Sequence, residues 1–465
     1  MIAVYRFAVA LALLCSANVA NAQEPLDVGD VLASVVATHP KMVEAEASIE
    51  FTRGQSLTAR RALEPKVGVS ASAVPAGYYN YWQMAATVEQ RVPSTGAKIL
   101  GGYRLGRGDI PTYYGEHETR DGGELFAKVN VPLLANRSID KERAEVRKTR
   151  IGTAQASFAM ESTWLAIARK ASLAYWEWSA AGQKLRVAEE LVGIAQDRAD
   201  RIRKQAESGA YPRIAVVDAE TMVLDRQSKR LQARGKFLSA QQKLSLVYRS
   251  PEGIPIAAGL DRVPMTSEAP KSFTFNLVET WIEAAIASRP ELRVAESQMQ
   301  LAKVDRALAR NKSLPTLDAN AFVARDLGVG ADSLGQTDVG MGLTLSIPLF
   351  QREGRGLEKQ AQAKVAIIEA KQRGLRDQIR AAILQSAQLA ILAQERRVIA
   401  LDRLAATEQL AEAERERILQ GSSNLLTLNL RELDVAAAAN EVIESTLEAH
   451  RASVELAYSR GAIAR

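Results

Sequence analysis

The sequence is poor in the residues that build disulfides and metal centres. Its one cysteine is Cys15, so the chain has no pair of thiols to join as an internal disulfide. The only three histidines, His39, His117 and His450, are far apart in sequence, and no spacing typical of a zinc site occurs. We therefore expect no metal and no cofactor.

Dense charge of one sign is also missing. The chain has 60 Lys and Arg against 54 Asp and Glu, a formal charge of +6, without a basic block that would indicate nucleic-acid binding. No nucleophile elbow is present, and the Gly-rich pieces 101–108 and 328–342 lack the lysine and the strand-to-helix context of a phosphate loop. We expect no nucleic-acid partner, no catalytic residue and no enzyme activity.

Long apolar runs are confined to the N-terminus. Residues 1–22 are predicted to be a secretory signal peptide, with Arg6, an apolar run from Phe7 to Leu14 and a small-residue motif that ends at Ala22. Beyond it, no window approaches the roughly 18 uncharged apolar residues of a membrane helix. If the mature chain enters a bilayer, it must do so as strands.

Two stretches of alternating apolar and polar residues indicate such strands. From Val339 to Leu349 the odd positions are apolar and the even ones polar, Gly or Pro, which is the period of a strand with one apolar face. The same pattern of strands flanked by proline occurs earlier in the chain. Pro65 precedes Pro315 by 250 positions, and the strand that ends before Pro132 precedes the strand that ends before Pro348 by 216 positions. The chain is therefore a tandem duplication.

Long helical segments accompany each strand pair. The first repeat is predicted over 23–250, a Pro-rich connector over 251–275, and the second repeat over 276–465 with its strand pair at 315–348. Helices are predicted at 27–62, 139–205, 213–248, 277–311, 357–419 and 425–460. A helix of nearly seventy residues far exceeds the usual length, and it indicates a coiled coil or helical barrel.

The first strand pair contains a long insertion, residues 75–122, that the second lacks. Its segments 82–92 and 98–105 alternate weakly, so it is either a long extracellular loop or an extra hairpin. Its aromatic residues fit ordinary hairpin packing or a membrane-interface girdle equally well. They are Tyr78, Tyr79, Tyr81, Trp82, Tyr103, Tyr113 and Tyr114.

Four marked strands cannot close on themselves, and an open sheet edge in lipid costs several kcal/mol for each unpaired backbone group. Several copies of the chain must then share one barrel. The duplicated order of helix, strand pair and helical hairpin resembles the TolC-like outer-membrane factor family over essentially the whole mature chain. The resemblance implies a mainly α fold with membrane β: four strands per protomer in a trimeric 12-stranded outer-membrane β-barrel, above a periplasmic α-barrel of long helical hairpins.

The resemblance also implies partners. They are two further copies in a homotrimer, outer-membrane lipid, a periplasmic adaptor (membrane fusion) protein, and an inner-membrane pump of RND or ABC type. The protein would be the passive duct of a tripartite efflux or type I secretion system, in the outer membrane with a large periplasmic portion. The alternative is a periplasmic coiled-coil adaptor or structural protein without a pore.

In this family the hairpin tips close the duct and contact the adaptor. Here the tips lie near 209 and 421, and positions six and nine after the second glycine, where aspartates often form a gate, are Thr427 and Leu430. Asp218 or the charged run Arg431, Glu432 and Asp434 is a candidate substitute; the alternative is that these charges lie on a solvated or intersubunit helix face. The candidate tip and gate residues are Gly209, Ala210, Tyr211, Pro212, Asp218, Gly421, Ser422, Ser423, Asn424 and Arg431.

Overall fold

The computed structural model describes residues 24–111, 117–266 and 268–463. The predicted signal peptide at 1–22, with Cys15, and the aromatic residues Tyr113 and Tyr114 lie outside the described residues. The chain forms two compact units, each drawn from both halves of the sequence. The sheet unit comprises 43–163 and 286–379, and the helical unit comprises the described residues up to 42, 164–285 and those from 380 onward.

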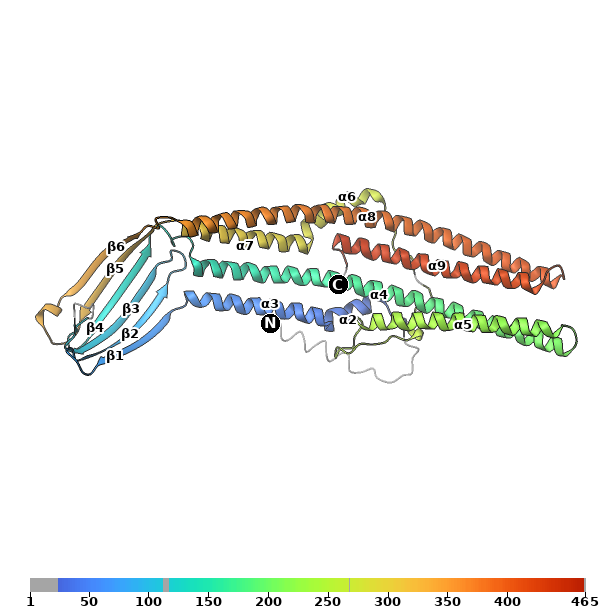
Figure 1. Ribbon diagram of the computed structural model, residues 1–465, viewed down its shortest axis with the longest axis horizontal. Coiled ribbons are helices and arrows are strands. Elements are labelled where there is room, and N and C mark those ends of the chain that lie inside the picture. Colours follow the sequence, from blue (N-terminus) through green and yellow to red (C-terminus); the bar gives the residue numbers. More distant parts are fainter. Residues whose placement is uncertain (1–23, 112–116, 267, 464–465) are drawn as a thin grey trace. The chain divides into compact units, whose positions relative to one another are not determined.

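The sheet unit holds one antiparallel sheet whose six strands follow chain order (Figure 1). Each strand pairs with the next along the chain, and the β4–β5 pairing joins the first half of the sequence to the second. The strands are β1 (Lys66–Val74), β2 (Tyr81–Arg91), β3 (Lys98–Gly108), β4 (Glu124–Pro132), β5 (Thr316–Asp326) and β6 (Thr337–Ser346).

The predicted number of four strands per protomer is therefore wrong, because the insertion 75–122 adds β2 and β3 to the same sheet. Of the two readings left open, the extra hairpin is the one found. Its alternation is weak in sequence because four of the 11 residues of β3 are glycine. One of them is required: a Cβ on Gly102 would lie 2.7 Å from the Ala86 carbonyl oxygen and 2.9 Å from the Phe126 ring.

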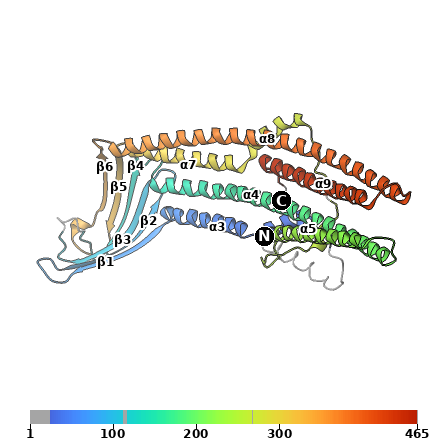
Figure 2. The same ribbon diagram turned by 45° about the vertical axis from the view of Figure 1, so that its right-hand side comes forward.

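Helices complete the sheet unit. They are α3 (Pro40–Arg60), the short η1 (Arg61–Leu63), α7 (Pro290–Lys312), and the first parts of α4 (Lys141–Glu207) and α8 (Arg352–Leu419). α7 lies along the start of α8 (Figures 1 and 2), where Lys364 contacts Asp305 at 2.9 Å and Met299, Ala302 and Ile368 form a small core. A further short helix, η5 (Asp332–Leu334), lies between β5 and β6.

The helical unit contains the ends of α4 and α8 with the helices that return beside them. They are α2 (Val28–Thr38), α5 (Arg213–Ser245), α6 (Val278–Ser288), α9 (Leu425–Arg460) and the short η3 (Leu260–Arg262) and η4 (Phe275–Leu277). α5 returns along α4 and α9 along α8 (Figure 2), as the contacts Arg203–Glu220 and Arg403–Glu441 require. The connector packs on α4, where the fully buried Trp178 donates its indole N–H to the Ala258 carbonyl at 3.2 Å.

Two predicted helices are each broken by a proline. The helix predicted at 27–62 is split at His39 into α2 and α3, and that at 277–311 is split at Arg289 into α6 and α7. Both break residues have extended backbone, with ψ of 129° at His39 and 127° at Arg289, because a following proline disfavours the helical conformation. The other four predicted helices are confirmed within a few residues at each end.

Within the described part of the chain, no helix is both long and apolar enough to span a bilayer.

Candidate functional site

One face of the sheet is apolar across all six strands. The register places Val67, Val88, Gly101, Ala127, Val323 and Val339 in one continuous row of cross-strand partners. Neighbouring rows on this face add Met84 beside Leu105, and Ala321 beside Met341. These side chains are solvent-exposed: Val67 is 76% exposed, Met341 87% and Leu343 72%. None of the residues that the structure describes covers this apolar surface.

The opposite face is polar and charged. Lys66 pairs across the sheet with Glu89, the Arg104 guanidinium forms an ion pair with Glu124, and Asn130 donates to the Asn320 side-chain oxygen at 2.6 Å. A shallow hollow of about 310 Å³ lies on this face. Its polar lining residues are Glu89, Lys98, Lys128, Asn130 and Asn320. The sheet thus has one apolar face and one polar, charged face.

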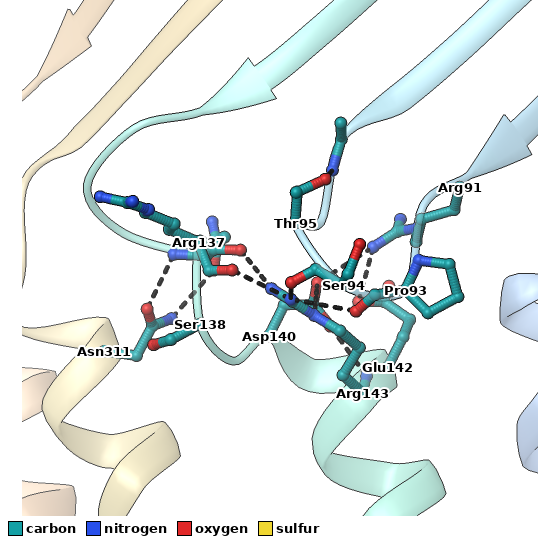
Figure 3. Close-up of polar contacts among 12 residues, drawn as sticks. Arg91, Pro93, Ser94, Thr95, Arg137, Ser138, Asp140, Glu142, Arg143 and Asn311 are labelled. Carbon is teal, nitrogen blue, oxygen red and sulfur yellow. Dashed lines mark hydrogen bonds and ion pairs between the residues drawn. The ribbon is translucent and has the colours of Figure 1, made fainter.

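A buried arginine ties the sheet to the start of α4 (Figure 3). The Arg143 guanidinium donates to the carbonyls of Pro93 at 3.3 Å and Ser94 at 3.4 Å in the β2–β3 turn, and to that of Arg137 at 2.9 Å in the loop before α4. Its Nε donates to Asp140 at 3.0 Å. The side chain of Arg143 is only 5% exposed, so this one cation organises the backbone at the helical end of the sheet.

Other contacts extend this junction. Arg91 at the end of β2 approaches Glu142 at 3.1 Å, and the Asn136 amide N–H donates to Asn311 of α7 at 2.7 Å. Gly96 fits under the same loop with φ of +75°, and a Cβ there would lie 2.7 Å from the Asn136 carbonyl oxygen. The sequence analysis missed this network, because its residues are scattered over more than two hundred positions without a motif.

The first hairpin tip is a glycine-capped helix end. Gly209, with φ of +82°, donates its N–H to the Ala206 carbonyl at 3.1 Å, and Ala210 donates to the Gln205 carbonyl at 2.9 Å. This is a Schellman motif, which satisfies the last free carbonyls of α4. Tyr211 is exposed, and Pro212 is the N-cap of α5.

The second tip repeats the motif and adds side-chain bonds. Gly421, with φ of +71°, donates to the Ile418 carbonyl at 3.0 Å, and Ser422 donates to that of Arg417 at 2.9 Å. Asn424 caps α9 by accepting from the Thr427 N–H at 2.9 Å. The Ser423 hydroxyl donates to Glu414, whose carboxylate is also 3.2 Å from Arg417. Glu414 is 4% exposed, and it is a tip residue that sequence reasoning missed.

The charged gate candidates have different environments. Asp218 is exposed on α5 and Arg431 contacts only Asp434 of its own helix, at 3.6 Å, within the described residues. Glu432, in contrast, accepts hydrogen bonds from the Arg198 side chain of α4. Both of its carboxylate oxygens lie within 2.8 Å of one Arg198 guanidinium nitrogen. Asn429 similarly meets Arg226 of α5 at 3.4 Å. The structure thus brings Glu432 to the other hairpin and leaves Asp218 and Arg431 at the surface.

Among the residues that the structure places, no group of three or more His, Cys, Asp or Glu side chains has the geometry to hold a metal ion.

Solved outer-membrane proteins share this fold. The protein VceC from Vibrio cholerae is 16% identical, with 93% of this chain and 96% of that chain covered and a TM-score of 0.61. The Campylobacter jejuni outer membrane channel CmeC is 12% identical over 94% of this chain and 85% of that one, with a TM-score of 0.62. The Neisseria gonorrhoeae outer membrane channel MtrE, in its open state, is 14% identical over 93% and 88%, with a TM-score of 0.62.

Part of the chain also matches a known family by sequence. Residues 281–462 match the profile of the family described as outer membrane efflux protein. The second half of the chain therefore resembles the outer membrane efflux protein family in sequence. None of the curated proteins matches the sequence.

This resemblance agrees with the expectation of an outer-membrane transport protein. It also implies a trimeric channel that works in tripartite efflux. The predicted fold class, long helical hairpins combined with antiparallel strands, is confirmed, apart from the number of strands.

Proposed function

We propose that three copies of the chain form the passive outer-membrane duct of a tripartite efflux or type I secretion system. An inner-membrane pump of RND or ABC type supplies the energy, and a periplasmic adaptor joins pump and duct. Outer-membrane lipid surrounds the sheets. The observation that carries this proposal is the exposed apolar face that runs in register through the sheet.

The sheet supports the proposal in two ways. A face with Met341 at 87% and Leu343 at 72% exposure is unfavourable in water, at roughly 25 cal/mol for each Å² of apolar surface, and is favourable against lipid. The outer edges of β1 and β6 pair with no strand of the described chain, and bare edges in lipid cost several kcal/mol for each backbone group. Neighbouring copies therefore have to supply the missing strands.

The tips are the proposed adaptor contact and gate. The two halves of the chain, taken as structural repeats, each contribute one hairpin with the same glycine-capped turn. The proposed contact residues are Gly209, Ala210, Tyr211, Pro212, Asp218, Gly421, Ser422, Ser423, Asn424 and Arg431. Arg198 and Glu432 join this set as the ion pair that holds the second hairpin against the first.

Fractionation and sizing test the duct. A detergent-requiring, heat-modifiable outer-membrane protein that elutes as a trimer on calibrated sizing is expected. A salt-washable protein that elutes as a monomer would favour the periplasmic adaptor alternative and contradict the proposal.

Single-channel recording tests the gate assignment. Gly421→Pro removes the positive φ that the second tip requires, and Asp218→Ala removes an exposed tip carboxylate, so both are expected to raise the closed-state conductance. Asp225→Ala, which removes another exposed carboxylate of α5 further from the tip, is the matched control and is expected to behave as wild type. Unchanged closed-state behaviour in both tip variants, with trimers intact, removes these residues from the gate.

A further inference from the structure

We propose that β2 and β3 cross the membrane beside the other four strands, so that each copy contributes six strands and the trimer closes an eighteen-stranded barrel. This inference rests on the proposed function as a trimeric duct. It replaces the twelve-stranded barrel that four strands per copy would give, and it assigns the interface between copies to β1 of one and β6 of the next.

The apolar face does not stop at the inserted hairpin. Val67 of β1 is joined to Ala127 of β4 only through Val88 of β2 and Gly101 of β3, in one row. Along β2 the residues on this face are Trp82, Met84, Ala86 and Val88, and along β3 they include Ile99, Tyr103 and Leu105. Met84 is 43% and Ile99 45% exposed. A hairpin that lay outside the bilayer would have no reason to continue the same apolar phase.

The other face of the hairpin is polar in the same register. Thr87 and Glu89 of β2 and Lys98 and Arg104 of β3 lie on the side that carries Glu124 and Lys128 of β4. The ion pair between Arg104 and Glu124 joins β3 to β4 on this side. The inserted strands therefore have the lipid face and the lumen face that a membrane barrel strand needs.

The turn between β2 and β3 lies at the helical end of the sheet. The Arg143 guanidinium at the start of α4 binds the carbonyls of Pro93 and Ser94 in this turn (Figure 3). At the opposite end of the strands, the Asp109 N–H donates to the Asn80 carbonyl at 2.9 Å. The chain thus runs away from the helical end of the sheet along β1 and β3, and it returns to that end along β2 and β4.

The lengths agree with this path. β2 and β3 have 11 residues each, as long as β5 and longer than β1 and β4 with 9. At about 3.4 Å per residue and a tilt of roughly 40°, such strands rise roughly 23 to 29 Å, the height of an outer-membrane apolar band.

An even number of strands lets copies close the barrel. β1 runs away from the helical end and β6 returns to it, so β6 of one copy can pair antiparallel with β1 of the next. Val67, Val69 and Ala71 on β1 and Met341 and Leu343 on β6 then keep the apolar face continuous across the junction. Eighteen strands is three times the six of one copy, within the range of barrels that enclose an aqueous channel.

Thiol labelling tests the position of the hairpin. Because the chain has no cysteine after Cys15, an introduced cysteine is the only thiol in that part of the protein. Met84→Cys and Leu105→Cys probe the apolar face of β2 and β3, Gln83→Cys and Thr87→Cys probe the polar face, and Met341→Cys on β6 is the membrane control. In proteoliposomes, a membrane-impermeant maleimide is expected to label the two polar-face variants at least about tenfold faster than Met84→Cys, Leu105→Cys and Met341→Cys, because lipid excludes the charged reagent.

The outcomes separate the two proposals. If Met84→Cys and Leu105→Cys label as fast as the polar-face variants while Met341→Cys stays protected, the hairpin lies outside the bilayer and the six-strand inference is wrong. If Met341→Cys is labelled equally fast, the sheet is not in lipid and the proposed duct fails with it.

Oxidative cross-linking tests the interface between copies. Ala71→Cys is combined with a cysteine at each apolar-face position of β6 in turn, from Val339 to Leu345. At least one combination is expected to give disulfide-linked oligomers, because facing Cβ atoms of paired strands lie about 5 Å apart. Links that form instead between β6 and cysteines placed on β4 would show that β1 to β3 lie outside the barrel wall.

Discussion

Arg198 of α4 holds Glu432 of α9 through one guanidinium nitrogen that lies 2.8 Å from Oε1 and 2.6 Å from Oε2 of the carboxylate. Both side chains are nearly buried, at 10% and 11% exposure, and the pair is less exposed than the Lys184–Glu444 and Arg169–Glu455 pairs that also join the two hairpins. Leu425 packs beside it against a core of Ala199, Ile202 and Ala219. Near its tip, the second hairpin is therefore held to the first by this ion pair, the Arg226–Asn429 hydrogen bond and a small apolar cluster.

Removal of one partner of this pair is expected to be costly. Arg198→Ala leaves the Glu432 carboxylate buried without its cation, at a cost of about 3 kcal/mol in the free energy of unfolding. Urea unfolding of the detergent-extracted protein measures it. The double variant Arg198→Met with Glu432→Leu is expected to recover most of the loss, because it leaves no uncompensated charge. A double variant as unstable as Arg198→Ala would show that the unpaired Glu432 carboxylate is not the cause of the lost stability.

The neighbouring Arg431 provides the matched control. It is partly exposed and contacts Asp434 of its own helix at 3.6 Å. Exposed pairs of this kind contribute about 0 to 1 kcal/mol, so Arg431→Ala is expected to change stability little. A loss as large as that of Arg198→Ala would mean that the tip is sensitive to any change of charge.

The N-cap at Asn424 is expected to order the second tip. Its side-chain oxygen accepts from the Thr427 backbone N–H at 2.9 Å and from the Thr427 hydroxyl at 3.0 Å. Asn424→Ala is expected to lose about 1 kcal/mol of helix stability, whereas Asn424→Asp keeps the acceptor and is expected to be close to wild type. Amide hydrogen exchange over the first turn of α9 measures both, and equal protection in the two variants would contradict the role of the cap.

His450 gives the helical unit an acid sensitivity. Its ring stacks on Trp176 with centroids 3.4 Å apart, and its Nε2 lies 2.8 Å from the Glu268 carbonyl oxygen, to which it donates. Burial, with a smaller contribution from the Arg397 charge, lowers the pKa of His450 to about 4, although the Glu268 carbonyl opposes this shift. The folded state therefore holds the ring neutral.

The sign of the pH effect follows from this shift. Because the pKa of His450 is lower in the folded state than its ordinary value of 6.5, the unfolded state takes up the proton first as pH falls. Stability is complete above pH 6.5 and falls between 6.5 and about 4, by up to about 3 kcal/mol from this group. His450→Gln is expected to remove this part of the acid loss, as measured by unfolding at pH 7 and pH 5. An identical pH profile in the variant would contradict it.

Gly96 is expected to be indispensable at the junction of sheet and helix. A Cβ there would lie 2.7 Å from the Asn136 carbonyl oxygen, on a residue with φ of +75°. Gly96→Ala is expected to cost at least about 1 to 3 kcal/mol through strain alone. Gly54→Ala, in α3 with nothing near its Cβ, is the control and is expected to stabilise by about 0.5 to 1 kcal/mol. Equal effects of the two substitutions on urea unfolding would contradict this account of Gly96.

The sequence predicted the helices and the marked strands because their patterns are local. Val339 to Leu349 alternates strictly, and the long helices lack proline between Lys141 and Glu207. The strand β3 was harder to predict because its four glycines dilute the alternation. Pairing with β1 and β4 is what places β2 and β3 in the sheet. Contacts such as Arg198–Glu432 and Arg143–Pro93 join residues that no local pattern relates. Glycine turns at the tips were predictable, whereas the polar partners around them were not.

The central claim is that sheets from three copies seal into one cylinder through lipid. An electron cryomicroscopy structure of the purified oligomer in lipid nanodiscs tests it most directly. The account predicts three-fold symmetry and a barrel wall of β1 to β6 from every copy, with Val69, Met84, Leu105 and Leu343 against lipid and Thr87, Lys128 and Asn320 towards the lumen. A monomer whose sheet lies folded away from lipid, with these apolar side chains covered by protein, would contradict it.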